Sequence, residues 1–315
     1  MFLVPDFKGF DFFPHGTRLN FMKFKNLCFG LSILAMVVSL ALIFTKGFNF
    51  GVDFKGGAMI ELKAKQGDAD LAGLRSKIGA LGLGDVQIQS FGTPSDVLIR
   101  VEEQPGGEEA QQEALKKIQD VVGAGYEQRR VEIVGPAVSS ELRRTGTIAV
   151  IASLIAIMLY VWFRFEWQFA VGTLVALAHD VLVTAGIFSL FQMEFDLSIV
   201  AALLTILGYS VNDTVVVSDR IRENLRKYKR MDLTELLNLS INETLSRTIL
   251  TGITTVAVLV ALFFLGGAVI QNFVFAMLFG VLIGTYSSIF IGAPILEYLG
   301  VKRDTVVGSE AKASS

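Results

Sequence analysis

The sequence predicts an α-helical polytopic membrane protein with six transmembrane helices and one small α+β domain between the first two helices. The chain of 315 residues is 52% hydrophobic and only 18% charged, below the ~25% charged residues of typical soluble domains. Several apolar runs approach or exceed the ~18 residues that indicate a membrane-spanning helix. A polar stretch, residues 46–144, contains no such run and separates the first span from the rest.

The apolar runs place six spans in order along the chain. They are expected at 26–45 and then at about 146–164, 168–191, 197–218, 248–266 and 272–298. The first run is too long for a cleaved signal peptide, and no small-x-small cleavage site follows it. We therefore expect an uncleaved first span.

Basic residues predict the orientation of these spans. They gather in 18–25, in the loop 219–246 and just after Gly300. By the positive-inside rule, the segment 1–25, the loop 219–246 and the tail 299–315 are then cytoplasmic. For the loop 219–246 we expect amphipathic helices lying at the membrane surface; the alternative is a solvated basic loop that only fixes topology.

The polar stretch 46–144 alternates between strand and helix periodicity, and with this orientation it lies on the periplasmic side. Its expected elements are strands at 58–65, 85–91, 96–102 and 126–134 and helices at 68–81 and 107–122. The resulting order βαββαβ predicts a ferredoxin-like domain. That fold hosts many functions and identifies none.

Composition and motifs exclude several functional classes. A net charge of −2 gives no sign of a nucleic-acid partner. Cys28 is the sole cysteine, so the fold depends on no internal disulfide. No nucleotide-binding loop, metal-ligand spacing or nucleophilic triad stands out. We expect a protein that is not an enzyme, with no cofactor or metal and an energy source other than bound nucleotide. The membrane potential supplies ~2.3 kcal/mol per charge per 100 mV.

Asp213 is the main candidate for chemistry. It lies inside the predicted fourth span, six residues before Asp219, which places it roughly 10 Å inside the membrane. A carboxylate there costs about 2.5 to 3.5 kcal/mol. Arg247 opens the fifth span, and antiparallel helices joined by 219–246 would bring the two residues together. Burial and a nearby arginine act on a carboxylate in opposite directions, so such a site can bind and release a proton. The alternatives are a structural hydrogen bond for Asp213 and a snorkelling end-of-helix role for Arg247.

Three further polar residues lie within the spans. His179 and Asp180 are adjacent near the middle of the third span and point about 100° apart, so at least one faces other helices. They form either a proton relay or a packed structural pair. Asn212, beside Asp213, is a candidate for the same relay or for an interhelical hydrogen bond. GVLIG at 280–284 has the small-xxx-small spacing of helix contacts.

Four segments together resemble a known family. They are FNFGVDFKGG (48–57), AHD (178–180), GYSVNDTVVVSDRIREN (208–224) and SRTILTGITT (246–255). These motifs resemble those of the SecD/SecF family of translocase subunits, within the resistance-nodulation-division superfamily. The similarity covers nearly the whole chain, and six spans with one modest outer domain match the SecF branch rather than the larger SecD branch.

The resemblance implies a function in protein export. Members work with SecD as a heteromeric complex beside the SecYEG channel, often with YajC, in the bacterial inner membrane. They use the proton-motive force to assist the late, periplasmic phase of preprotein translocation, while the separate SecA subunit hydrolyses ATP. Within the family the fourth-span aspartate and fifth-span arginine serve proton transport, which here match Asp213 and Arg247. The alternatives are a non-enzymatic assembly scaffold and half of a proton-coupled exporter of small molecules or lipids.

Overall fold

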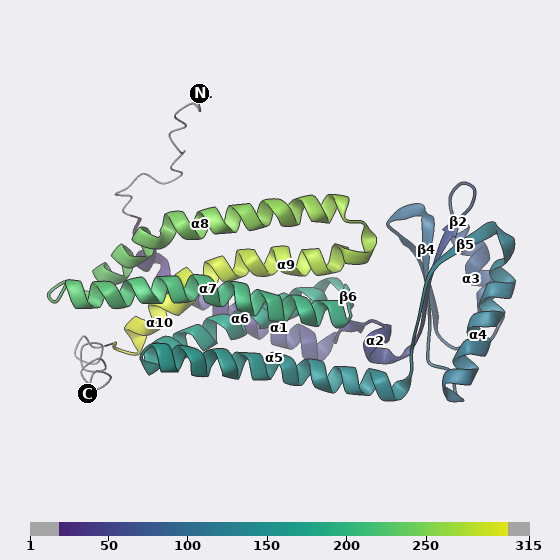
Figure 1. Ribbon diagram of the computed structural model, residues 1–315, viewed down its shortest axis with the longest axis horizontal. Coiled ribbons are helices and arrows are strands. Elements are labelled where there is room, and N and C mark those ends of the chain that lie inside the picture. The colour runs from purple at the N-terminus through teal and green to yellow at the C-terminus, as the bar shows by residue number, and fades with distance from the viewer. Residues whose placement is uncertain (1–18, 302–315) are drawn as a thin grey trace, which may run out of the picture.

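A computed structural model describes residues 19–301 of the chain. Most of the predicted N-terminal segment and tail, residues 1–18 and 302–315, therefore lies outside the described residues. The protein is an elongated bundle of long helices with a small α/β domain at one end (Figure 1). The two described ends of the chain meet at the opposite end of the bundle, where Met22 and Val301 belong to one buried cluster with Leu225 and Leu236.

The bundle contains six helices that are long and apolar enough to cross a membrane, which confirms the six predicted spans. They are α1 (Lys25–Thr45), α5 (Pro136–Arg164), α6 (Trp167–Phe191), α7 (Leu197–Lys227), α8 (Leu233–Leu265) and α9 (Ala268–Ser287), the last continued by a π-helical turn (Ser288–Gly292) and α10 (Ala293–Tyr298).

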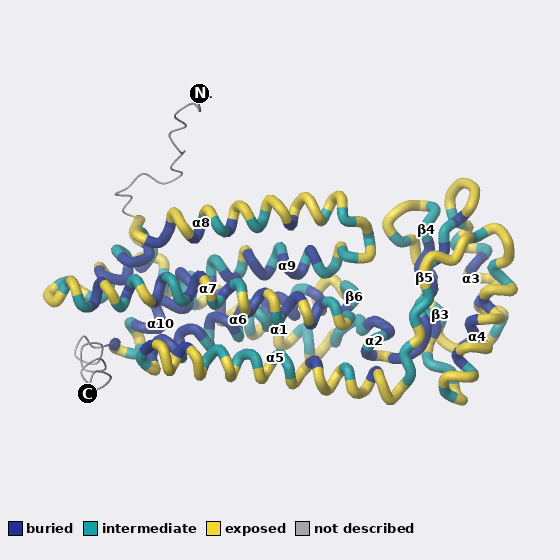
Figure 2. The backbone as a smooth tube through the Cα atoms, viewed as in Figure 1, coloured by how far each residue is buried: buried dark blue, intermediate teal, exposed yellow. Residues whose placement is uncertain are grey.

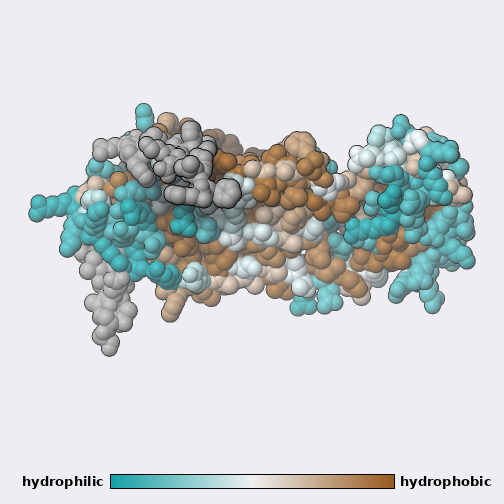
Figure 3. Space-filling model, turned by 45° about the horizontal axis from the view of Figure 1, so that its top comes forward, coloured by the Kyte–Doolittle hydropathy of each residue, from teal (hydrophilic) through white to brown (hydrophobic). Residues whose placement is uncertain are grey.

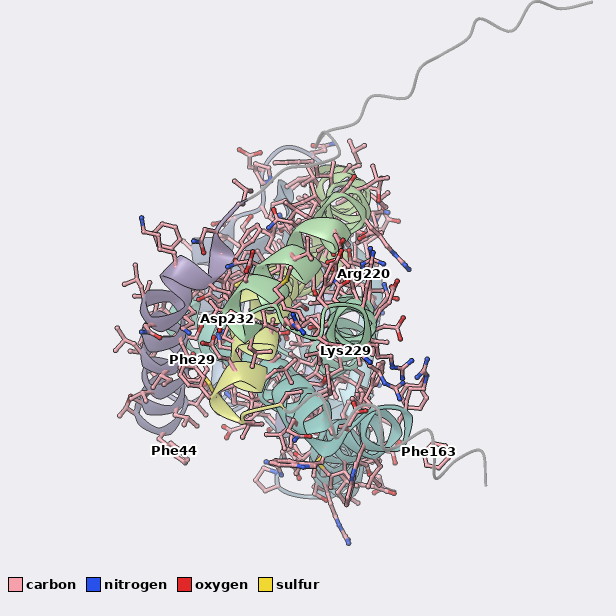
Figure 4. All side chains as sticks on the ribbon, turned by 90° about the vertical axis from the view of Figure 1, so that its left-hand side faces the viewer. Phe29, Phe44, Phe163, Arg220, Lys229 and Asp232 are labelled. Atoms are coloured by element: carbon pink, nitrogen blue, oxygen red, sulfur yellow. The ribbon has the colours of Figure 1, made fainter. Side chains whose placement is uncertain are left out.

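The surface of the bundle matches a membrane environment. On the face shown in Figure 3, apolar surface covers the middle of the bundle and polar surface covers both ends of the molecule. Large apolar side chains point outward from the bundle, among them Phe44 and Phe163, which are 84% and 95% exposed (Figure 4). Exposed phenylalanines of this kind are stable against lipid chains but unfavourable in water.

The segment 219–246 is almost entirely helical, as expected, but its helices are continuations of α7 and α8 rather than separate amphipathic helices. Helix α7 runs on to Lys227 and α8 begins at Leu233, so only 228–232 form a turn, with Asp232 capping α8 through Thr234 N. At ~1.5 Å per residue, helices of 31 and 33 residues exceed the ~30 Å apolar core of a bilayer.

Packing between the two helix ends explains their continuation beyond the spans. Leu225 and Leu236 are buried together, and Asn224 donates to Ser240 Oγ at 2.9 Å. Arg220 pairs with Glu243 at 2.7 Å. Figure 4 looks onto the end of the molecule at which α7 turns into α8, and it labels Arg220, Lys229 and Asp232 there. The charged residues that suggested the end of a span therefore lie on helices that continue beyond it.

Helix α5 also differs from the prediction. It begins at Pro136, ten residues before the expected start at 146, and its first turns belong to the range assigned to the outer domain. Proline suits the first turn of a helix because its missing N–H is not needed there. These turns pack against the short helix α2 (Val52–Lys55), so α5 connects the two parts of the molecule.

The outer domain has the predicted order of strands and helices. Its elements are β2 (Gly57–Ala64), α3 (Leu71–Gly79), β3 (Val86–Phe91), β4 (Thr93–Val101), α4 (Gly107–Val122) and β5 (Tyr126–Val134). The sheet order is β3-β4-β2-β5, with every neighbouring pair antiparallel. Helices α3 and α4 cover one face over a core that includes Ile60, Ile78, Ile99 and Ile118. The other face of the sheet is directed toward the bundle (Figures 1 and 2).

A second, two-stranded sheet forms the joint between the parts. Strand β1 (Asn49–Phe50) pairs in parallel with β6 (Glu194–Phe195), which lies between α6 and α7. Around this pair the rings of Phe48, Phe54 and Phe188 contact Phe195. The alternating aromatic residues after the first span therefore attach the outer domain to the bundle.

Candidate functional site

Two glycines on α9 allow α7 to approach closely at the centre of the bundle. A Cβ at Gly280 would lie 2.3 Å from Cδ1 of Ile206, and one at Gly284 would lie 3.0 Å from Cβ of Ser210. Both contacts fall on α7, so the predicted helix contact of GVLIG is confirmed. Small residues at such crossings let helix backbones come together.

Asp180 occupies the centre of this crossing. Its carboxylate, on α6, is fully buried. Oδ2 accepts hydrogen bonds from Ser210 Oγ of α7 at 2.6 Å and from Ser287 Oγ of α9 at 2.8 Å. Nδ1 of His179 lies 3.0 Å from Oδ1. One carboxylate therefore joins three helices in a low-dielectric environment, where charge-assisted hydrogen bonds are strong.

Further hydroxyl groups extend this network. Thr214 Oγ1 lies 2.9 Å from Ser288 Oγ, one turn along the crossing. On the other side, the ring of His179 packs near Tyr286. The Tyr286 hydroxyl is 2.9 Å from Ser32 Oγ and donates to a backbone carbonyl of α1. The buried polar groups thus connect α1, α6, α7 and α9.

Asp213 lies in a different environment three residues beyond Ser210 on α7. It is 3% exposed, and its Oδ2 has no hydrogen-bond partner among the residues that the structure describes. An unsatisfied buried acceptor costs roughly 1–3 kcal/mol, more when it is charged. Native structures keep few such groups, and each calls for an explanation in function or in an unseen ligand.

Arg247 lies on the neighbouring helix α8, as expected from the sequence. Its guanidinium interacts electrostatically with the Asp213 carboxyl, but among the described residues the two form no ion pair within 4.0 Å. The Arg247 side chain is exposed, whereas that of Asp213 is buried. Asn212 is also exposed and does not join the buried network.

The sequence interpretation missed the hydroxyl partners. Ser210 and Thr214 follow each other at four-residue spacing on the helix that carries Asp213, and Ser287 and Ser288 are adjacent in the last span. Hydroxyl residues at four-residue spacing on an otherwise apolar helix share one face. This spacing could have predicted a polar face of the helix that packs against another helix.

The sequence matches a known family over most of its length. Residues 114–302 match the family described as protein export membrane protein SecD/SecF, C-terminal, and residues 41–68 match the SecD/SecF GG motif. The chain belongs to the SecD/SecF family. It is 46% identical over 290 residues to the protein translocase subunit SecF of Rickettsia rickettsii, covering 90% of this chain and 92% of the relative. It is 45% identical to the SecF subunit of Cereibacter sphaeroides, covering 94% and 96%. These relatives make it a SecF-type subunit.

Fused relatives are longer. The translocase subunit SecDF of Brucella abortus is 43% identical, and the match covers 95% of this chain but 40% of that protein. The crystal structure of SecDF from Thermus thermophilus superposes with a TM-score of 0.80 at 37% identity, over 90% of this chain and 39% of the other. A SecDF structure in the super-membrane-facing form has a TM-score of 0.67 at the same identity, over 93% of this chain and 40% of the other.

In this SecF-type chain the GG motif forms part of the connection between the outer domain and the bundle. Gly56 and Gly57 both have positive φ, and a Cβ at Gly57 would lie 2.3 Å from the carbonyl oxygen of Val101, so both positions favour glycine. Asp53 Oδ2 accepts a hydrogen bond at 2.9 Å from the backbone N–H of Leu197. The motif therefore contacts the first residue of α7, the helix that carries Asp213.

An ion pair also joins the outer domain to this region. Arg100 of β4 pairs with Glu194 of β6, and their side chains are 11% and 16% exposed. Burial raises the pKa of the Glu194 carboxyl; Arg100 counteracts this in part, while Asp196 and Asp53 add to it. Glu194 was not among the residues that the sequence singled out, because an acidic residue in a short connection ordinarily faces solvent.

Proposed function

We propose a function for this chain as an accessory subunit of Sec protein export in a membrane. We propose that it works with SecD beside the SecYEG channel in the inner membrane and uses the proton-motive force to assist late, periplasmic-side translocation of preproteins. YajC and, indirectly, the SecA ATPase belong to the same proposed assembly. The observation that carries this proposal is the buried Asp213 carboxyl, whose Oδ2 lacks a protein partner in the described chain while Arg247 acts on it from α8.

The contrast between the two buried carboxylates supports this assignment. Asp180 has hydrogen-bond partners on both of its oxygens. Protonating it would disturb bonds that hold three helices together, which favours the structural interpretation of the His179–Asp180 pair. Oδ2 of Asp213 accepts no hydrogen bond from the described residues. A proton can therefore bind there without breaking a hydrogen bond within this part of the protein. Arg247 can then compensate its charge when the proton leaves.

The topology supports the proposed orientation. Both described chain ends and the α7–α8 turn lie at one end of the bundle, and the α/β domain lies at the other (Figure 1). With the basic end in the cytoplasm, the domain would be periplasmic, and its sheet order with two helices on one face supports the proposed ferredoxin-like fold. SecD would supply a second set of six spans, for which the sparsely buried faces of α1, α5 and α8 are available.

Preprotein export in cells that carry Asp213→Asn tests the proposal. The amide keeps the size of the side chain and removes its titratable proton. We expect export to stall while the membrane levels of this subunit and SecD stay normal. Asp219→Asn is the matched control, because Asp219 is on the same helix but exposed and paired only loosely with Arg164, at 3.6 Å; it should leave export unchanged.

Each contrary result points to one alternative. Normal export in Asp213→Asn, with loss of export on deletion of the outer domain, would make the protein an assembly scaffold. Normal export together with loss of a small-molecule or lipid efflux activity would make it half of an exporter. Either outcome would refute proton-coupled assistance of export through Asp213.

A further inference from the structure

The outer domain contacts the bundle at the connection between the two helices that carry buried carboxylates. This connection, residues 192–196, follows α6 with Asp180 and precedes α7 with Asp213. Its strand β6 pairs with β1, and its Glu194 forms the ion pair with Arg100. Within the described residues, β6 is the only strand that lies between bundle helices. This two-residue strand therefore links α6 and α7 to the segment that leads into the outer domain.

The surrounding interface is hollow. Cavities of 260, 280 and 430 Å³ lie between the open face of the sheet and the ends of the bundle helices. A further cavity of 380 Å³ is lined by Arg100 together with Phe50 and Val52. The Arg100–Glu194 pair stands among these cavities. Because close packing is what transmits displacement through protein interiors, a loosely filled interface transmits little except at its direct contacts.

The ion pair lies in an environment that disfavours the charged carboxylate of Glu194. Burial together with Asp53 and Asp196 raises the pKa of Glu194 in spite of Arg100. Buried ion pairs of this kind contribute little net stability, and their best-attested use is to fix one arrangement among several. The backbone also makes room for it, since a Cβ at Gly51 would lie 2.9 Å from Oε1 of Glu194.

We propose that the Arg100–Glu194 pair is the coupling contact through which α6 and α7 position the outer domain. The inference rests on the proposed function, because it supplies the route by which a change at Asp213 reaches the periplasmic side. Arg100 and Glu194 are positioning residues, because they act by holding the sheet to the bundle.

Both residues of this contact belong to elements that can pass on a displacement. Asp213 is sixteen residues into α7 from Leu197, roughly 24 Å along a rigid helix whose first residue is fixed to Asp53. A shift or rotation of α7 therefore displaces β6 directly. At the other end, Arg100 belongs to β4, which is an inner strand of the four-stranded sheet. A force on β4 moves the whole sheet, whereas a force on an edge strand or loop would bend it locally.

Crosslinking across the hollow interface measures the docking of the domain without reference to export. Thr93 and Gln271 are exposed and line the same 430 Å³ cavity from the sheet and from α9. With Cys28→Ala as background, cysteines at these two positions would be joined by a short bifunctional maleimide in membranes that contain the full complex. We expect Arg100→Gln or Glu194→Gln to lower the crosslinking rate about tenfold or more, because each leaves a buried charge unpaired.

The matched control is Arg130→Gln. Arg130 lines the same interface, but its ion pair is with Glu132 of its own strand. It should crosslink and export at the normal rate. The exchange Arg100→Glu with Glu194→Arg restores the opposite charges and should recover both crosslinking and export, which a purely structural loss would not do. Gly51→Ala displaces Glu194 without changing any charge and should lower crosslinking as the single variants do.

The outcomes separate this inference from the proposed function. Normal crosslinking and export in Arg100→Gln and Glu194→Gln would overturn the coupling contact, even if Asp213→Asn stalls export. Equal crosslinking loss in Arg130→Gln would also overturn it, because the effect would then belong to the sheet face in general. Loss of crosslinking with normal export would show that docking does not couple to function, and would overturn it as well.

Discussion

The approach of α7 to α9 predicts a specific sensitivity to one added methyl group. In Gly280→Ala the new Cβ would lie 2.3 Å from Cδ1 and 2.4 Å from Cγ1 of Ile206. Ile206 is 1% exposed and belongs to a buried cluster, so it cannot turn outward. Overpacking of this kind costs ~1–3 kcal/mol, against a gain of ~1 kcal/mol from replacing a helical glycine. We expect a net loss of up to about 2 kcal/mol.

Gly208 provides the matched control. It lies on the exposed side of α7, and a Cβ there would meet nothing within 4 Å. Gly208→Ala should therefore be neutral or stabilising by up to ~1 kcal/mol. The free energy of unfolding, measured by denaturant titration in mixed micelles, would compare the two variants.

A double-mutant cycle makes this prediction refutable. Ile206→Ala alone opens a cavity and should cost ~2–5 kcal/mol. In that background the methyl of Gly280→Ala enters empty space, so the second change should become stabilising. The sign of the Gly280→Ala effect must reverse if the clash is its cause. A loss of equal size with and without Ile206 would show that the glycine acts through something other than close helix approach.

Two further predictions concern the buried polar groups. If Asp213 and Arg247 form one functional unit, export in the double variant Asp213→Asn with Arg247→Met should be no worse than in the more damaging single variant; additive losses of the export rate would contradict a shared site. Ser210→Ala and Ser287→Ala should each lower the free energy of unfolding by about 0.6 kcal/mol and at most about 1.7 kcal/mol, the mean and the maximum measured for hydrogen bonds between membrane helices. Unchanged stability in both serine variants would mean that Asp180 does not hold the three helices together.

Strong periodicity is what made most of the fold predictable. The spans are long apolar runs, and a chain in lipid must satisfy its backbone within helices, so length and composition suffice to locate them. Several strands and helices of the outer domain were predictable because one face of the element is buried. In β2, Ala58, Ile60 and Leu62 alternate with partly exposed residues, and in α4, Ala114, Leu115 and Ile118 recur at helical spacing.

The ends of α7 and α8 could not be placed by the same rule. The charges from Asp219 onward predict the end of a span, although charge indicates only contact with water. What continues the helices is the pairing of two apolar stripes, with Leu225 of one packed near Leu236 and Ile241 of the other. That pairing depends on a tight turn at 228–232, which composition alone does not specify.

The environment of each candidate site residue was still less predictable. Asp180 obtains its partners from residues 30 and 107 positions away, and isolated serines in spans are common packing residues. The sequence located Asp213 and Arg247 on neighbouring helices through the hairpin that joins them. It could not reveal that Arg247 is exposed or that Asp213 Oδ2 has no hydrogen-bond partner within residues 19–301.

The two buried carboxylates can be understood only together with the packing of the helices that carry them. The glycines of α9 bring Ser287 and Ser210 to one oxygen of Asp180, and this fixes the mutual position of α6, α7 and α9. With that crossing fixed, Asp213 sits one turn farther along α7, beyond reach of the same hydroxyls. In the proposed mechanism, a fixed crossing beside Asp213 would give a proton a defined place to bind. It would also give α7 a fixed point about which a change at Asp213 moves the other end of the helix, next to Glu194 and the outer domain.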